Sequence, residues 1–480
     1  MNAPREKIAP AVAELHRLFG LQRAAFAQER YPSYKVRQDR LARLKALVTK
    51  NEARFAAAVD SDFGDRSEHE TRLAELYIVA AEIADAQRQL KRWMRAERVA
   101  TPLHLMPGRA RIERQPRGVA GIVSPWNYPV QLALAPALGA LAAGNRVLLK
   151  PSELTPATSA LLRELVAASY AEDEFAVVLG NADVGRAFTH LPFDHLFFTG
   201  STAVGREVAR AAAENLTPVT LELGGKSPAL FAPDADLRLA APRLVSGKLL
   251  NAGQTCIAPD YVLVPADRAD ALVAAIRKAA DRMYPSYAAN PDYTAIVNER
   301  HYRRLTALVD DARAKGATIV TLNPANEKPA PSSRKLLPTL VLGVTDDMAI
   351  MRDEIFGPLL PVETYETIDD AIAKLNARPH PLAFYYFGKD GARSGRVLRE
   401  TLAGGVTVND TLWHFVHKHL PFGGVGASGS GAYHGEASFL TFTHRKPVFV
   451  QPRVAAAKLL YPPYGGAFET VLALLRKLSA

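Results

Sequence analysis

The sequence predicts an α/β fold with an open, mostly parallel sheet of the nucleotide-binding type, a second α/β domain and a small β extension. From Gly118, short apolar runs such as "RVLLK", "HLFFTG" and "VTLELGG" alternate with helical patterns, which is the rhythm of such a sheet. A second series, including "YVLVP", "LPVETY" and "LAFYYFG", follows along the chain. With 480 residues, 48% of them hydrophobic, the chain is also too long for one ordinary domain.

The predicted elements divide the chain into segments in order. Residues 1–97 are expected to be mostly helical, because "ETRLAELYIVAAEIADAQRQLKRWMRA" and similar stretches place apolar residues three and four apart. We expect these helices and residues 118–223 to form the nucleotide-binding domain, and residues 224–420 to form the second domain. Within 98–117, "RARIERQ" alternates like a strand and predicts an exposed hairpin that finds cover on another subunit. The tail, 454–480, ends in an amphipathic helix that packs on the body or on a subunit, with peripheral membrane contact as the alternative.

Composition narrows the classes of function. The net charge of +10 comes from 59 Lys+Arg against 49 Asp+Glu and would attract anionic partners such as nucleotides. The basic residues are scattered, so nucleic-acid binding is not expected. No stretch approaches the roughly 18 apolar residues of a membrane span, and the N-terminus lacks the apolar core of a signal peptide. The single cysteine argues against disulfides and is compatible with a reducing cytoplasm, and no metal site is expected.

That cysteine, Cys256, stands in the polar turn "NAGQTC" directly after an apolar helical pattern. A cysteine in such a turn can face a cleft, where a helix N-terminus or nearby N–H groups would lower its pKa and favour the thiolate. A lone cysteine is more often a small buried apolar residue. Taken by itself, the turn leaves both interpretations open.

Two further side chains could support a reactive thiol. Glu222 ends an apolar β-run and precedes two glycines, which places it at the carboxyl end of a strand, where open α/β sheets bind ligands. If half-buried, it would have a raised pKa and could take a proton from water, although a helix cap or a salt bridge explains it as well. Asn127 is held between Pro125 and Pro129 after another strand, and its rigid amide could serve an oxyanion hole or merely satisfy the turn.

Other motifs are of the kind that binds a nucleotide. In "FFTGSTAVG" a β-run ends at Gly200 and a helix begins near Ser201, so the free N–H groups of the helix could hold a pyrophosphate. Only Gly200 and Gly205 are present, which is less than the full glycine fingerprint of dinucleotide-binding folds. Lys150 and Glu153 follow a further strand and could bind ribose hydroxyls, or form an ordinary exposed pair.

In "RDEIFGPLLPV" an acid and an aromatic side chain stand two residues apart. In an extended segment, Glu354 and Phe356 would therefore point to the same side of the chain. Together they could hold a polar sugar and an aromatic ring.

Seven motifs occur in a fixed order between Pro125 and Gly435: "PWNYP", "KPSE", "FTGSTAVG", "LELGGKSP", "NAGQTC", "EIFGP" and "PFGGVGASGSGAYHG". With this set in this order, the chain resembles the aldehyde dehydrogenases. Its length and the ending "SGSGAYHGEASFLTFTHRKPV" are similar to the class 3-like branch, and "MYPSYAANPDYTAIVNERHYRRL" resembles the bacterial coniferyl aldehyde dehydrogenases. The resemblance implies an aldehyde dehydrogenase-like α/β fold with a Rossmann-type cofactor domain, an α/β catalytic domain and a small β oligomerisation extension.

Carried over residue by residue, the resemblance implies a nucleophile (Cys256), a general base (Glu222) and an oxyanion donor (Asn127). It implies that NAD, with NADP as an alternative, binds to Trp126, Lys150, Glu153, Gly200, Ser201, Gly205, Leu223, Glu354 and Phe356. It also implies a homodimer bridged by residues 98–117 and 436–453. The enzyme would oxidise an aldehyde to its acid in the cytoplasm, through a thioester on the cysteine.

The substrate and the reaction type have alternatives. Tyr128, Trp413 and Phe415 could line an aromatic tunnel, which favours aryl, cinnamyl (such as coniferyl) or medium-chain aldehydes, although several of them could be plain core. A cysteine esterase or thioesterase would need the thiol and the oxyanion donor without a nucleotide. A CoA-acylating dehydrogenase would lack a base such as Glu222, so that residue favours water as the acyl acceptor.

Overall fold

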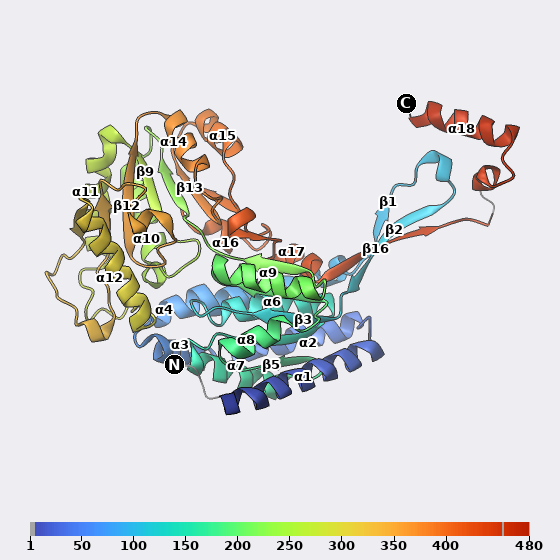
Figure 1. Cartoon of the computed structure of the whole chain (residues 1–480), viewed down its shortest axis with the longest axis horizontal. Coiled ribbons are helices and arrows are strands. Elements are labelled where there is room, and N and C mark those ends of the chain that lie inside the picture. The colour runs from blue at the N-terminus through green and yellow to red at the C-terminus, as the bar shows by residue number, and fades with distance from the viewer. Residues whose placement is uncertain (1–4, 454–455, 480) are drawn as a thin grey trace.

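The computed structural model describes residues 5–453 and 456–479. Figure 1 shows a body in which two sheets with their helices lie side by side, and an arm that projects from the body and ends in the last helix. The predicted fold class is confirmed: three sheets are present, of six, seven and three strands. The domain boundaries given above remain predictions.

The N-terminal part is helical, as predicted. Its helices are α1 (Arg5–Gln28), α2 (Tyr34–Thr49), α3 (Glu52–Phe63), α4 (Glu68–Thr71) and α5 (Ile78–Trp93), with the π-helix η1 (Arg72–Tyr77) between the last two. The residues that join α4, η1 and α5 have right-handed helical φ and ψ, so residues 68–93 form one continuous helix with a π segment inside it. Apolar side chains of α2, α3 and α5 share a buried core with α6.

The six-stranded sheet has the order β15-β7-β6-β3-β4-β5, and only β15 at its edge runs antiparallel. Its strands are β3 (Val119–Val123), β4 (Arg146–Lys150), β5 (Phe175–Val177), β6 (His195–Thr199), β7 (Val219–Glu222) and β15 (Gly429–Ser430). Its helices are α6 (Gln131–Ala143), α7 (Pro156–Ser169), α8 (Ala182–Thr189) and α9 (Thr202–Glu214). Every residue of β4, β5 and β6 is buried, as expected for strands covered on both faces.

The seven-stranded sheet has the order β10-β11-β12-β9-β8-β13-β14, and only its edge strand β10 runs antiparallel. The strands are β8 (Pro228–Phe231), β9 (Tyr261–Pro265), β10 (Thr318–Thr321), β11 (Thr339–Leu342), β12 (Leu359–Tyr365), β13 (Ala383–Phe387) and β14 (Gly405–Val408). The helices are α10 (Leu237–Leu249), α11 (Ala269–Met283), α12 (Glu299–Ala314), α13 (Ala349–Arg352), α14 (Ile368–Asn376), α15 (Gly391–Glu400) and α16 (Trp413–Val416), with the short 3₁₀ turns η3 (Leu250–Gly253), η4 (Ala266–Arg268) and η5 (Pro331–Ser333). Helix α17 (Gly435–Thr441) packs on α5 and α6 instead, and the turn η6 (Gly426–Ser428) directly precedes β15.

The arm is the third sheet. It joins β1 (Glu97–Val99), β2 (Arg109–Pro116) and β16 (Thr443–Val450), with 3₁₀ turns η2 (Leu103–Leu105) and η7 (Ala456–Leu460) and helix α18 (Gly466–Ser479) near its tip. The predicted strand "RARIERQ" is therefore present, and it pairs with β16 along eight residues. In Figure 1, α18 lies at the far end of the arm, away from the body of its own chain. No helix among residues 5–453 and 456–479 is long and apolar enough to cross a bilayer.

Candidate active site

The turn that carries Cys256 has an unusual backbone. In η3, which follows α10, Asn251 and Ala252 have φ of 53° and 50°, in the left-handed region. For residues other than glycine, this conformation costs on the order of 1–2 kcal/mol each. All residues from 251 to 260 are buried except Cys256, which is half-buried. The surroundings thus enforce a strained turn and leave the thiol at its accessible edge.

Asn127 lies against this turn, in the loop between β3 and α6. Its side chain is buried, and its Nδ2 donates to the carbonyl of Gln254 at 3.1 Å. The following residues of the two segments, Tyr128 and Thr255, are also hydrogen-bonded, with the Tyr128 hydroxyl 2.7 Å from Thr255 Oγ1. An amide nitrogen has two hydrogens, so Asn127 retains one for a further acceptor. The predicted oxyanion donor and the predicted nucleophile are therefore brought together.

Glu222 ends β7, as predicted. Its side chain is buried, and neither carboxylate oxygen has a hydrogen-bond partner among the described residues, so it is neither a helix cap nor half of a salt bridge there. Burial raises the pKa of this carboxyl well above its usual range. A buried carboxyl with free oxygens and a raised pKa is suited to take up a proton near neutral pH.

The expectation for the thiol pKa needs correction. Burial, followed by the negative charges of Glu354 and Glu222, raises the pKa of Cys256 above its usual value, whereas the sequence predicted a lowered pKa. The backbone N–H groups of Cys256 and Ile257 oppose the rise but do not outweigh it. The reason is that the turn is buried and follows a short 3₁₀ segment, so it gains no long helix dipole. The thiol must therefore pass its proton to a base.

The predicted phosphate turn is formed between β6 and α9. Ser201 caps α9, since its hydroxyl accepts from the N–H of Val204 at 3.4 Å. A Cβ at Gly205 would lie 2.6 Å from the Leu223 side chain, so the helix start packs closely on the strand that carries Glu222. The N–H groups of this capped first turn and the exposed Ser201 fit an anionic group such as a pyrophosphate.

Lys150 and Glu153 lie at the end of β4. Lys150 is buried and its Nζ donates to Glu153 Oε2 and to the carbonyl of Pro151, both at 3.1 Å. Glu153 keeps 44% of its side chain exposed. An ammonium with a third hydrogen and an accessible carboxylate form a donor and acceptor pair of the kind that holds a ribose diol.

The loop with Glu354 and Phe356 is held from two sides. Asp260 accepts the N–H of Ile355 at 2.9 Å, and its other oxygen pairs with Lys226 Nζ at 2.5 Å. Lys226 also donates to the carbonyl of Asp353 at 3.1 Å. Phe356 has φ of 53° and meets Trp126 edge-on, with ring centroids 5.3 Å apart. Burial, then Asp260, raises the pKa of Glu354 to about 8.

The three residues expected in the substrate pocket differ in position. Tyr128 is buried and lies against the nucleophile turn. Phe415 is half-buried, with its ring 4.9 Å from that of Phe422 and 4.7 Å from His434. Trp413 has 59% of its surface exposed in the chain by itself, so this structure does not place it in a closed pocket.

Several site residues could not be found from the sequence. His301, on α12, lies 5.1 Å from Trp126 between ring centroids, and Arg304 donates to the carbonyl of Ile355. Arg66, in the loop between α3 and α4, and Glu70, on α4, contact the two catalytic loops. Charged residues within a helical pattern can belong to a buried face or to a face in contact with solvent. A single sequence does not distinguish these two cases. No group of three or more His, Cys, Asp or Glu within 5–453 and 456–479 could hold a metal ion.

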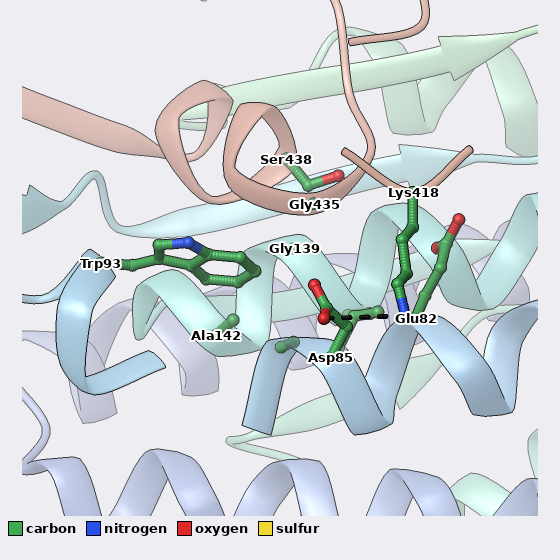
Figure 2. Close-up of a pocket in the computed structure, with 10 residues that line it drawn as sticks. Glu82, Asp85, Trp93, Gly139, Ala142, Lys418, Gly435 and Ser438 are labelled. Atoms are coloured by element: carbon green, nitrogen blue, oxygen red, sulfur yellow. Dashed lines mark ion pairs between the residues drawn. The ribbon is translucent and has the colours of Figure 1, made fainter. Parts of the chain in front are cut away.

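A separate pocket lies between α5, α6 and α17 and includes none of the predicted site residues. In Figure 2, Glu82 and Asp85 rise from one helix, Lys418 reaches down to Asp85, and the indole of Trp93 lies across the pocket from Lys418. The Lys418 Nζ to Asp85 Oδ1 distance is 3.7 Å. Burial, then Asp85, raises the pKa of Glu82 to about 8. His434 Nε2 is 3.7 Å from Glu82, but burial lowers the histidine pKa to about 3, so both groups are uncharged at neutral pH.

Comparisons with known proteins agree with the motifs. The model of the aldehyde dehydrogenase family matches residues 11–448. The chain is 50% identical to the "Probable coniferyl aldehyde dehydrogenase" of Pseudomonas aeruginosa over 96% of both chains. The solved Staphylococcus aureus AldH in its substrate-bound state superposes with a TM-score of 0.91 at 39% identity, over 96% of this chain and 99% of that one.

A further solved structure is a cysteine-to-alanine variant of Pseudomonas syringae aldehyde dehydrogenase C in complex with NAD⁺ and octanal. It has a TM-score of 0.82 and 31% identity, over 91% of this chain and 89% of that one. The identity and the coverage of both chains exceed what a shared fold alone would give. By motifs, fold and sequence identity, this chain is an enzyme of the aldehyde dehydrogenase family.

Proposed function

We propose that the chain oxidises an aldehyde to the carboxylic acid, with Cys256 as nucleophile, Asn127 as oxyanion donor and Glu222 as general base. The observation that carries the proposal is the hydrogen bond from Asn127 Nδ2 to the Gln254 carbonyl, two residues before the only cysteine. A nucleophile, a rigid amide and a buried base with free oxygens are the groups that acyl chemistry on a thiol requires.

In the first step the Cys256 sulfur bonds to the aldehyde carbon and the carbonyl π electrons move to oxygen. Burial and the charges of two carboxylates raise the pKa of the Cys256 thiol, so the thiol must transfer its proton to a base. The proposed acceptor is Glu222, one of these two carboxylates. Asn127 and the N–H of Cys256 donate to the new oxyanion. A preorganised donor of this kind contributes on the order of 10²–10³ in rate.

NAD is the proposed cofactor, and it fits the residues present. The capped turn at Ser201 would hold the pyrophosphate, Lys150 with Glu153 one ribose, and Glu354 with Phe356 the nicotinamide end. When bound, the nicotinamide supplies the acceptor for the hydride that leaves the substrate carbon. The accessible carboxylate of Glu153 would repel a 2′-phosphate, which favours NAD over NADP.

The acyl group is then carried on Cys256 as a thioester. Once Glu222 has released the first proton to solvent, it removes a proton from the attacking water, the electron pair of the breaking carbon–sulfur bond goes to sulfur, and the acid leaves. The presence of this base favours water over coenzyme A as acyl acceptor. It does not separate the dehydrogenase from a cysteine esterase, but the turn at Ser201 and the Lys150–Glu153 pair would have no role in an esterase.

For the substrate, we propose an aromatic or cinnamyl aldehyde such as coniferyl aldehyde, with medium-chain aliphatic aldehydes as the second candidate. The name of the Pseudomonas aeruginosa relative supports the first and the octanal in the Pseudomonas syringae complex the second. Kinetics with coniferyl aldehyde, benzaldehyde and octanal, each with NAD and NADP, separate them. Coniferyl aldehyde is expected to give the highest kcat/KM, and a preference of about tenfold or more for octanal would reverse the assignment.

The Cys256→Ala variant tests the reaction type. It should lose aldehyde-dependent cofactor reduction while binding NAD within about twofold of the unaltered protein, because the substitution removes no group assigned to the cofactor. Turnover at a near-normal rate would refute the mechanism. Ester hydrolysis by the wild type without any aldehyde-dependent reduction of NAD or NADP would instead support the esterase.

We propose a cytoplasmic homodimer joined through the arm. The three-stranded sheet projects from the body with most residues of β16 exposed, and small isolated sheets are only marginally stable. Phe449 and Val450 on β16 and Leu103 in η2 are more than 40% exposed in the single chain, which leaves apolar surface for a partner. Light scattering should give twice the 52.1 kDa of one chain, and a monomer at micromolar concentration would contradict the proposal.

A further inference from the structure

Two buried or half-buried carboxylates on the N-terminal helix reach the catalytic loops. Glu70 lies on α4 and Glu75 on the π-helix η1. In an α-helix, residues five apart differ by about 140° around the axis, because each residue turns the helix by about 100°. A π segment bonds residue i to i+5, so residues five apart come close to one turn apart. The π segment thus brings both carboxylates to the same side of the helix.

Glu70 holds the nucleophile turn. Its two oxygens accept the backbone N–H of Asn251 at 3.1 and 3.0 Å, and Thr294 Oγ1 donates to it at 2.8 Å. Asn251 is the first of the left-handed residues that precede Cys256. A carboxylate on the N–H of a strained residue stabilises that conformation against relaxation.

Glu75 holds the oxyanion loop at its other end. Its Oε2 accepts the N–H groups of Val130 and Gln131 at 2.7 and 3.2 Å, where α6 begins. A negative charge at a helix N-terminus is favourable. These contacts fix the end of the loop three residues after Asn127.

Arg66 joins the two carboxylates to the loop between them. Its side chain is fully buried, its Nη1 donates to the carbonyl of Asn127 at 2.7 Å, and its guanidinium lies over the ring of Tyr128 at 4.9 Å. Its charge acts on both Glu70 and Glu75, and its Nη2 is 3.5 Å from Glu75 Oε1. The same Asn127 carbonyl accepts Asn251 Nδ2 at 3.0 Å, which closes the connection between the loops.

We infer that Arg66, Glu70 and Glu75 are positioning residues: from a third element, they set the relation between the Asn127 amide and the Cys256 turn. None of the hydrogen bonds given above joins them to the thiol or to the Asn127 side chain. They bond the backbone of the two loops, whose spacing decides whether the oxyanion of a bound aldehyde meets its donor. The inference rests on the proposed roles of Cys256 and Asn127.

The test compares Glu70→Gln with Glu68→Gln, two residues earlier on α4. Glu68 is 63% exposed and pairs only weakly with Arg72, so its variant controls for loss of a carboxylate on the same helix. Three quantities are measured for each: kcat with a saturating aldehyde, the Kd of NAD, and the rate at which iodoacetamide alkylates the protein. Because Cys256 is the only cysteine, the alkylation rate reports on this turn alone.

Glu70→Gln should lower kcat about 10- to 100-fold, since misplacement of catalytic groups by about 1 Å can cost 10²-fold. The alkylation rate should rise at least threefold as the turn relaxes and exposes the thiol, while the Kd of NAD stays within twofold. Glu68→Gln should match the wild type in all three. If Glu70→Gln stays within twofold of Glu68→Gln in kcat and alkylation, the inference is wrong.

If Glu70→Gln does not fold, the variant Arg66→Lys provides the test instead. Lysine keeps the buried charge between the carboxylates but lacks the planar fork that reaches the Asn127 carbonyl. It should fold and lose kcat with NAD binding retained. If both variants unfold, the three residues hold the whole domain and the inference fails. Failure of the proposed function has a different signature, because wild-type protein would then show no aldehyde-dependent reduction while the alkylation comparison still applies.

Discussion

Replacing Asn127 with alanine removes the side-chain amide beside the nucleophile turn and little else. The carbonyl of Gln254 loses the Asn127 donor at 3.1 Å but keeps Asn251 Nδ2, also at 3.1 Å. The Asn127 carbonyl belongs to the backbone, so its bonds from Arg66 and Asn251 survive. The cost to folding is therefore one neutral hydrogen bond, about 1 kcal/mol.

The cost to catalysis is larger. Removing one oxyanion donor lowers kcat on the order of 10²–10³-fold, which corresponds to about 2.7–4 kcal/mol of transition-state stabilisation. The variant should thus lose roughly three to four times more free energy in the transition state than in folding. Steady-state rates of NAD reduction and the melting temperature measure the two quantities on the same protein.

Asn145→Ala is a matched control. Asn145 is buried in the same domain and donates to the carbonyls of Ala140 and Phe442, and its Oδ1 accepts the N–H of Gly118. Its variant should lower the melting temperature more than Asn127→Ala while kcat stays within threefold. If Asn127→Ala itself keeps kcat within threefold and remains folded, Asn127 is not the oxyanion donor.

The other predictions address the base, the cofactor loop and the pocket of Figure 2. Glu222→Gln removes the proposed base of both proton transfers, so it should lower the steady-state rate about 10²–10⁴-fold without a burst of reduced cofactor, and a full steady-state rate would exclude Glu222 as base. Asp260→Asn weakens the hold on the Ile355 N–H and should raise the Kd of NAD about tenfold by fluorescence titration, whereas an unchanged Kd would show that the loop needs no such hold. The pKa of Glu82 is raised from 4.5 to about 8, so between these pH values the folded state keeps a proton that the unfolded state releases. The stability that this proton contributes is therefore lost as pH rises from about 4.5 to 8. Glu82→Gln should therefore gain melting temperature relative to wild type toward pH 8, and an equal difference at pH 5 and pH 8 would contradict this.

The sequence was most informative where chemistry sits in loops between regular elements. The loops of Asn127 and Cys256 could be identified because prolines, glycines and one cysteine follow strands or helices in a readable order. The contact between the two loops is a tertiary contact, the hydrogen bond from Asn127 to Gln254. It forms because the two sheets lie next to each other. From the sequence, the pairing of Asn127 with Cys256 follows only from the resemblance to the aldehyde dehydrogenases.

What could not be predicted depends on burial. The pKa of Cys256 was expected to fall, yet desolvation of the turn outweighs its N–H groups, and no local pattern reveals how much water a turn loses. The place of Trp413 in the pocket stays a prediction: it is mostly exposed in the chain by itself, and its aromatic character does not show what covers it. Glu70 resembles a surface charge of a helix, because one sequence does not show which helical face is covered, and Arg66 resembles a charge in an exposed loop.

The length of the π segment between α4 and α5 is coupled to its helical geometry. Deleting one of Arg72, Leu73 or Ala74 would leave Glu70 and Glu75 four residues apart, and residues four apart in a regular α-helix differ by only about 40° around the axis. Such a deletion, with a return to α geometry, would therefore keep both carboxylates on the same side of the helix. Keeping the present length in regular α geometry would instead separate them by about 140°, with every side chain still present. A change of helical geometry at constant length would thus act on the active site as a substitution there would.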